Sequence, residues 1–165
     1  LPICRFLNFP YIAAQKTADK TFTANTATLI TFNQTDYSNA ITNNTSDGFH
    51  VEFEGIYNYQ FSIQWANTDS QEHDGWCWLR KNGTDVAGTA SQFTVPKRHG
   101  TVDGHSIGAA NFFIQLAADD YVEMWAAVND VTVSMGYSAA QTVPFAMPAI
   151  PSVVATLSFV SSIPA

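Results

Sequence analysis

The sequence predicts an all-β sandwich of antiparallel strands. Five large apolar side chains occupy every second position of residues 57–65 and alternate with four polar ones. A period of two places all five on one face of an extended segment, the pattern of a half-buried strand. No segment repeats apolar residues convincingly at helical spacing, and Asn, Gln, Thr and Ser supply most of the polarity. That composition suits exposed strand faces and is poor material for helices.

Strand signals precede this segment. Residues 26–32 are predicted to form a strand that leads into a polar loop, residues 33–47. Residues 48–53 then alternate between apolar and polar side chains, and Glu54–Gly55 is predicted to turn the chain into the long strand.

Downstream, residues 75–80 are predicted to form a strand that ends in a tight hairpin turn. Asn82–Gly83 favours the positive φ angles of such a turn, so we expect the chain to reverse there. Residues 91–95 form a further short predicted strand, and residues 96–104 a basic loop that contains glycine.

The last third of the chain continues the pattern. Residues 111–116 and 121–126 are two predicted strands joined by a turn at residues 117–120. Two more, residues 131–135 and 152–161, follow. The total is eight to ten strands at the spacing of a sandwich, with no solenoid or propeller repeat.

The length of 165 residues fits one domain with its own core. We expect residues 21–165 to form this domain and residues 1–20 to be an N-terminal arm or first strand. The chain starts at Leu1, which indicates processing, truncation or a missing upstream region. Cys4 and Cys77 can form a disulfide, but two buried free thiols are favoured.

The net charge of −7 bears on the partners of the protein. An acidic surface repels phosphate backbones, which argues against nucleic acid and anionic membranes. The simpler interpretation is that the charge keeps an apolar-rich protein soluble. No run approaches the roughly 20 apolar residues of a membrane span, so no membrane insertion is predicted.

Two of the predicted strands, residues 121–126 and 153–160, are apolar on both faces. Such a strand in an antiparallel sheet has its second face covered as well. We expect the cover to be another copy of the protein, the alternative being the 33–47 loop or the N-terminal segment. The candidate contacts between copies are Tyr121, Trp125, Val154 and Val160.

Catalytic motifs are absent from the sequence. It contains no Gly-x-Ser-x-Gly and no phosphate-binding glycine loop. Asp119 and Asp120 are adjacent in a predicted turn, where their side chains point apart, so they are interpreted as turn formers. We therefore predict no enzyme, no cofactor and no metal.

Two loops carry candidate contact residues. His73 and Asp74 lie in the acidic loop at residues 67–75, which can ligate a cation through its oxygens but is better interpreted as a solvated loop. The basic loop contributes Lys97, Arg98 and His99. His99 and His105 could meet a metal if three copies converged on an axis, an alternative that we do not adopt.

The four tryptophans raise a sugar-binding hypothesis, because sugars stack on flat rings. Trp65 and Trp125 have the periodicity of core residues, so we expect both in the core. Trp76 and Trp78 share one strand face that can be exposed.

Three motifs in order resemble the complement-head and tumour-necrosis-factor-like superfamily. Residues 55–61 resemble its G-x-Y-x-F strand, and residues 79–83, Leu-Arg-Lys-Asn-Gly, its L-x-K-N-G hairpin. Residues 116–122 are similar to its L-x-x-G-D-x-V turn, with Ala118 where glycine is usual, a change that a type I turn tolerates. Residues 152–161 fit its final strand, so the resemblance spans about residues 26–161.

The resemblance implies a ten-strand antiparallel jelly-roll sandwich, a homotrimer around a shared axis and no enzymatic activity. The Asn-, Thr- and Ser-rich composition is most similar to the versions in phage virions. We therefore expect a virion structural protein (a capsid decoration, head fibre or tail-fibre tip) on the virion surface, with other virion proteins or the host surface as partners. The alternative is a secreted, extracellular adhesion or receptor-ligand module that binds protein or glycan. A jelly-roll enzyme that acts on sugars is a minor third hypothesis.

Overall fold

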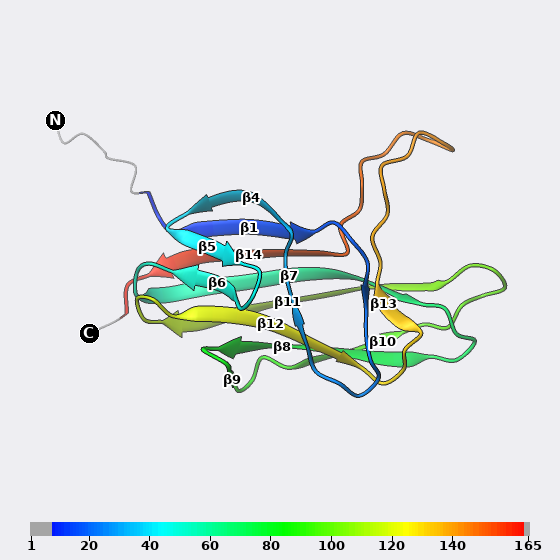
Figure 1. The fold of residues 1–165 in the computed structure, drawn as a ribbon, viewed down its shortest axis with the longest axis horizontal. Coiled ribbons are helices and arrows are strands. Elements are labelled where there is room, and N and C mark those ends of the chain that lie inside the picture. The colour runs from blue at the N-terminus through cyan, green and yellow to red at the C-terminus, as the bar shows by residue number, and fades with distance from the viewer. Residues whose placement is uncertain (1–7, 164–165) are drawn as a thin grey trace.

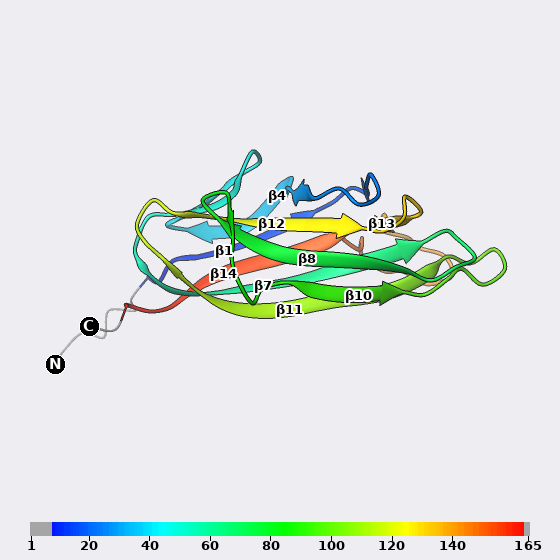
Figure 2. The same cartoon turned by 90° about the horizontal axis from the view of Figure 1, so that it is seen from below.

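The computed structural model describes residues 8–163, and these residues form two stacked antiparallel β-sheets without a helix (Figures 1 and 2). Sheet A has five principal strands in the order β4, β1, β14, β7 and β11. Their bounds are Gln34–Asn39, Tyr11–Lys16, Val153–Ser161, Gly55–Asn67 and Gly104–Leu116. Two short strands, β13 (Val133–Met135) and β2 (Lys20–Thr21), extend sheet A beside the end of β7.

Sheet B also has five principal strands, in the order β5, β6, β12, β8 and β10. Their bounds are Ile41–Asn44, Gly48–Val51, Tyr121–Val128, His73–Lys81 and Ser91–Val95. The short strands β3 (Thr28–Ile30) and β9 (Thr84–Asp85) pair with β12 and β8. The chain passes repeatedly from one sheet to the other along these ten principal strands, which confirms the ten-strand jelly-roll sandwich.

The core lies between the sheets, and β7 supplies its largest side chains. Tyr57, Tyr59, Phe61, Ile63 and Trp65 are all buried, as the alternation predicts. Their inward face packs against β8 and β12, whose inward residues include Leu79 and Met124.

Trp65 fills the space that two glycines leave open. A Cβ on Gly75 of sheet B would lie 2.7 Å from Cη2 of the indole. A Cβ on Gly108 of sheet A would lie 2.6 Å from its Nε1. Both glycines are therefore required by the close approach of the ring, since real side-chain carbons do not come this close.

The two turns predicted between strands are present. Asn82 and Gly83 have φ of 50° and 77° between β8 and β9, as expected for Asn-Gly. In the turn between β11 and β12, Asp119 has φ of 67°, and Asp120 accepts a hydrogen bond from the amide of Ala117 at 2.8 Å.

The prediction of a polar loop at residues 33–47 is wrong, because β4 and β5 lie there. Each is the outermost principal strand of its sheet, where most side chains face water, so neither carries an alternation of apolar and polar residues. Ala40, with φ of 53°, reverses the chain between them. β11 also begins earlier than predicted, since small residues such as Gly104 and Gly108 weaken the strand signal.

Residues 136–150 leave the body between β13 and β14 as a narrow two-stranded hairpin, drawn in orange in Figure 1. Residues 11–16 are an integral strand of sheet A, between β14 and β4. Within residues 8–163 no helix has the length and apolar character to cross a membrane. Cys77 is buried, and Cys4 lies outside the described residues.

Candidate interaction surfaces

The outward face of sheet A is uncharged across four neighbouring strands. The cross-strand register aligns its side chains in three rows that run from β1 through β14 and β7 to β11. We call these twelve residues the sheet A face: Tyr11, Ser158, Asn58 and Phe113; Ala13, Thr156, Gln60 and Asn111; Gln15, Val154, Ser62 and Ala109.

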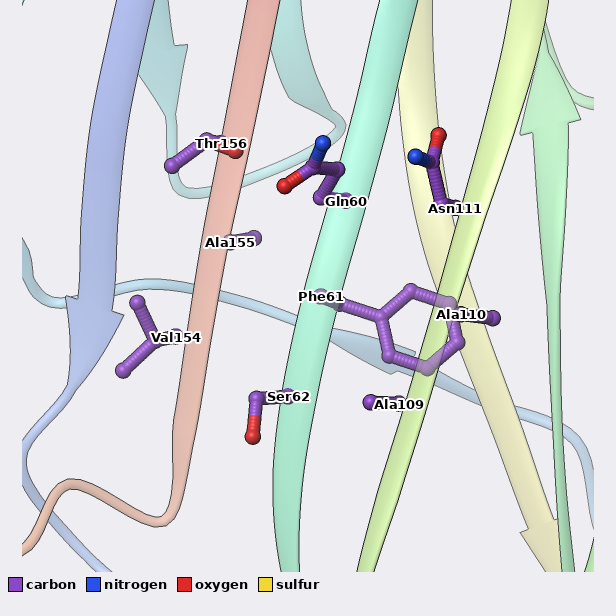
Figure 3. Close-up of a pocket in the computed structure, with 9 residues that line it drawn as sticks. All are labelled: Gln60, Phe61, Ser62, Ala109, Ala110, Asn111, Val154, Ala155 and Thr156. Carbon is purple, nitrogen blue, oxygen red and sulfur yellow. The ribbon is translucent and has the colours of Figure 1, made fainter.

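A hollow of about 520 Å³ lies in this face, over β14, β7 and β11 (Figure 3). The small side chains of Ser62 and Ala109 line it in one row, with Val154 beside them. Gln60 and Asn111 line it in the next row. The hollow exists because small residues on β7 and β11 leave the sheet surface uncovered.

The outward face of sheet B is different, because it combines aromatic and charged side chains. Trp78 and Trp125 lie opposite each other on β8 and β12. The guanidinium of Arg80 lies 3.9 Å from the ring centroid of Trp125. Asp85 accepts hydrogen bonds from Arg80 Nε at 2.6 Å and from Trp78 Nε1 at 2.7 Å. The bond from Arg80 is the main cause that holds the pKa of Asp85 below its ordinary value.

A second aromatic pair adjoins this cluster. His50 stacks on Tyr121 with ring centroids 5.0 Å apart, and its Nε2 lies 2.7 Å from Oδ1 of Asp47. The prediction that Trp125 is a core residue is wrong, because its strand turns Met124 inward and Trp125 outward. The outward residues of β12 are thus covered in part by groups of the same chain.

The structure does not bring the four predicted contact residues onto one surface. Val154 and Val160, at 38% and 50% exposure, lie on β14 of sheet A. Tyr121 and Trp125 lie on the outward face of sheet B and are half-buried. The two pairs therefore occupy opposite sides of the sandwich. The period of each strand was predicted correctly. The side chains of the same chain that cover its outward face were not predicted.

The predicted loop contacts gather at one end of the molecule. His73 and Asp74 belong to β8 and not to a loop, which corrects their predicted location. The amide of Arg98 donates to the carbonyl of Asp69 at 2.8 Å, which holds the two loops side by side. Lys97, Arg98 and His99 are exposed there.

The acidic groups at this end are held by hydrogen bonds. His73 Nε2 lies 2.9 Å from Asp69 Oδ2, and this hydrogen bond is the main cause that lowers the pKa of Asp69. Asp74 instead accepts from Gln92 and Thr94. Among residues 8–163, no group of three or more His, Cys, Asp or Glu side chains is arranged to hold a metal ion.

Cys77 and Asp120, two residues with reactive side chains, have structural roles in the fold. Burial raises the pKa of the Cys77 thiol, which keeps it protonated and unreactive. Asp120 accepts from the side chain of Asn82 at 2.6 Å and so links two turns. A second hollow, of about 510 Å³, lies beside β13 and is lined by polar side chains that include Asp19, Asp103 and His105.

Two features were missed from the sequence: the hollow in sheet A and the hairpin at residues 136–150. One sequence signal was available, since residues 131–165 contain no charged side chain. That run of 35 residues includes the hairpin and the whole of β14.

No protein-family model matches the chain, and no curated protein matches it. Among solved structures it is similar to the globular domain of zebrafish complement 1qA protein, with a TM-score of 0.56 and 12% sequence identity. The similarity covers 94% of this chain and all of the zebrafish domain. At this identity the similarity shows the jelly-roll fold.

Proposed function

We propose that the protein is a trimeric, non-enzymatic binding module of the complement-head kind. In this proposal the sheet A faces of three copies meet around a shared axis, and the sheet B face and the loops turn outward. The observation that carries it is the absence of charge from the twelve residues of the sheet A face.

The lack of charge makes this face the favoured contact between copies. Each copy carries a net charge of −7, so copies repel one another wherever charged surfaces meet. The cores of protein interfaces are correspondingly depleted of charged residues. Val154, in the sheet A face, and Val160, at the end of the same strand, are the proposed axis contacts, both exposed in the single chain.

Tyr121 and Trp125 are assigned to the outward side instead of the axis. Arg80 and His50 of the same chain already cover their rings in part, and Arg80 brings charge to the surface. Such a mixture of aromatic rings and polar groups suits an exposed binding surface for protein or glycan.

Three copies are preferred over two because the motifs and the fold resemble a trimeric superfamily. The structural similarity is to a complement protein, so it favours the extracellular adhesion module over the virion structural protein. A place on a phage particle remains a second setting for the same module, supported by its Asn-, Thr- and Ser-rich composition.

Ala109→Glu tests the contact through the sheet A face, since it places a carboxylate in the hollow of that face, beside Ser62. We expect light scattering after size-exclusion chromatography to give a trimer for the unmodified chain and a monomer for Ala109→Glu. Ala118→Glu, in the exposed turn between β11 and β12, is the matched control and should stay trimeric. A trimeric Ala109→Glu would exclude the sheet A face as the contact.

A second experiment tests the outward surface. Purified trimer is applied to a glycan array and to intact cells, and separately to empty phage capsids. Binding to glycans or cells that Trp78→Ala abolishes supports the adhesion module. Tight binding to capsids alone would favour the virion structural protein over the adhesion module. Hydrolysis of a polysaccharide would contradict the proposal that the protein is not an enzyme.

A further inference from the structure

The hairpin at residues 136–150, which we call the arm, is held together by few contacts. Its two strands meet at two isolated bridges, Ser138 with Ile150 and Gln141 with Met147. Four backbone hydrogen bonds of 2.8–3.1 Å form them. No side-chain hydrogen bond or ion pair involves residues 138–150 in the described part of the chain. Figure 1 shows the arm projecting from the body beyond the edge of sheet A.

The tip of the arm exposes apolar side chains. Val143 is 79% and Phe145 61% exposed, and Pro144 lies between them. An isolated two-stranded hairpin is marginally stable in water. An apolar, uncharged arm of this kind is therefore stabilised when its tip is covered by another surface.

We propose that the arm tip of one copy docks into the hollow of the sheet A face on a second copy. This proposal rests on the association of copies proposed above, and it names the segment and the site that join them. Phe145 and Val143 are the inserted side chains, and Ser62 and Ala109, on the β7–β11 side of the hollow, form the receiving surface, so that Val154 on β14 stays at the axis.

The two surfaces match in polarity and size. Neither carries a charged side chain, although the chain as a whole is acidic. A hollow of about 520 Å³ is within the usual size range of ligand pockets and accommodates an aromatic side chain. Five residues beyond Ser138 give the arm a reach of about 16 Å at roughly 3.3 Å per residue.

The occupant is a second copy because the arm extends away from its own sheet. Arm and hollow are different patches of one chain, so the contact is heterologous, and repeated contacts of this kind form a ring when the rotation between copies closes. A closed ring of three arms agrees with the proposed trimer.

Cross-linking tests the contact. Tagged Val143→Cys and untagged Ala109→Cys, both in a Cys4→Ser background that leaves only the buried Cys77, are co-expressed and oxidised. We expect a disulfide-linked dimer of one tagged and one untagged chain. The matched control pairs Val143→Cys with Ser46→Cys, which is also exposed to solvent but lies outside the hollow. It should give no such dimer.

A second variant needs no new disulfide. Val143→Ser with Phe145→Ser is expected to raise the dissociation constant of the trimer roughly tenfold or more, because both side chains would lose a buried site. Val131→Ser, which alters an apolar residue of 62% exposure outside the arm, should leave it unchanged.

The outcomes separate this proposal from the proposed function. A trimer without the cross-link, and with an unchanged dissociation constant in the arm variant, overturns the docking and leaves the trimer standing. The arm would then be open to another protein or a lipid surface. A chain that remains monomeric overturns both.

Discussion

Gly75→Ala changes one methyl group in the core, and its effect follows from the position of Trp65. The new Cβ would lie 2.7 Å from Cη2 and 2.8 Å from Cζ2 of the indole, well inside van der Waals contact. Gly75 has no positive φ, so alanine can adopt its backbone conformation. The cost is therefore steric, and we expect Gly75→Ala to lower the free energy of unfolding by about 1–3 kcal/mol.

Trp65→Phe removes the ring atoms that the new methyl group would meet. In the Trp65→Phe background the clash is absent, while alanine still restricts the unfolded chain by about 0.4–1 kcal/mol relative to glycine. Gly75→Ala should there be neutral or slightly stabilising. The coupling energy between the two positions is thus expected to be about 1–3 kcal/mol.

Urea denaturation followed by far-ultraviolet circular dichroism measures all four proteins of this cycle. Protomer concentration must be equal throughout, because association contributes to the stability of an oligomer. An equal cost of Gly75→Ala in both backgrounds would refute the packing of Trp65 against β8.

Two further predictions concern polar groups. Thr89→Val should lower the free energy of unfolding by about 1–3 kcal/mol in urea, because the buried Thr89 hydroxyl accepts from the amide of Leu79 at 3.0 Å and donates to the carbonyl of Val86 at 2.7 Å. Thr89→Ser keeps both bonds and should cost less; an equal cost would contradict this role. Partial burial alone would raise the pKa of Asp120. The hydrogen bonds that the carboxylate accepts outweigh this effect, and the bond from Asn82 contributes most, so the pKa lies below the ordinary 3.8. A lowered pKa stabilises the folded state above pH 3.8, and this stabilisation is lost as the pH falls through the folded-state pKa. The stability difference between the unmodified chain and Asp120→Asn should therefore be larger at pH 6 than below pH 3, and a constant difference would refute the linkage.

The sequence predicted best those strands that have one buried face. Residues 57–65 alternate because they line the core on one side only. β10 was predicted with its observed bounds, and its residues also alternate between more and less buried positions. β4 and β5 were missed because strands at the edge of a sheet need no apolar face.

The candidate contacts show a different limit. Periodicity identifies which residues of a strand share a face, but not what neighbouring strands place over it. Trp125 and Tyr121 are covered in part by Arg80 and His50, which lie on other strands. Val154 has no comparable cover, because its neighbour on β7 is the small Ser62.

The arm could not be predicted as a structure for a third reason. Its residues follow neither a period of two nor a helical period, and its bridges involve only two pairs of residues. The one signal of this region in the sequence is the lack of charge in residues 131–165.

Sedimentation equilibrium of the unmodified chain tests the central claim, that uncharged surfaces join three copies into one module. The account predicts a single species of three times the 18.0 kDa chain mass at micromolar protomer concentrations. It further predicts that the mass persists at low salt, where charged surfaces repel most strongly. A mass of one chain under these conditions would contradict it.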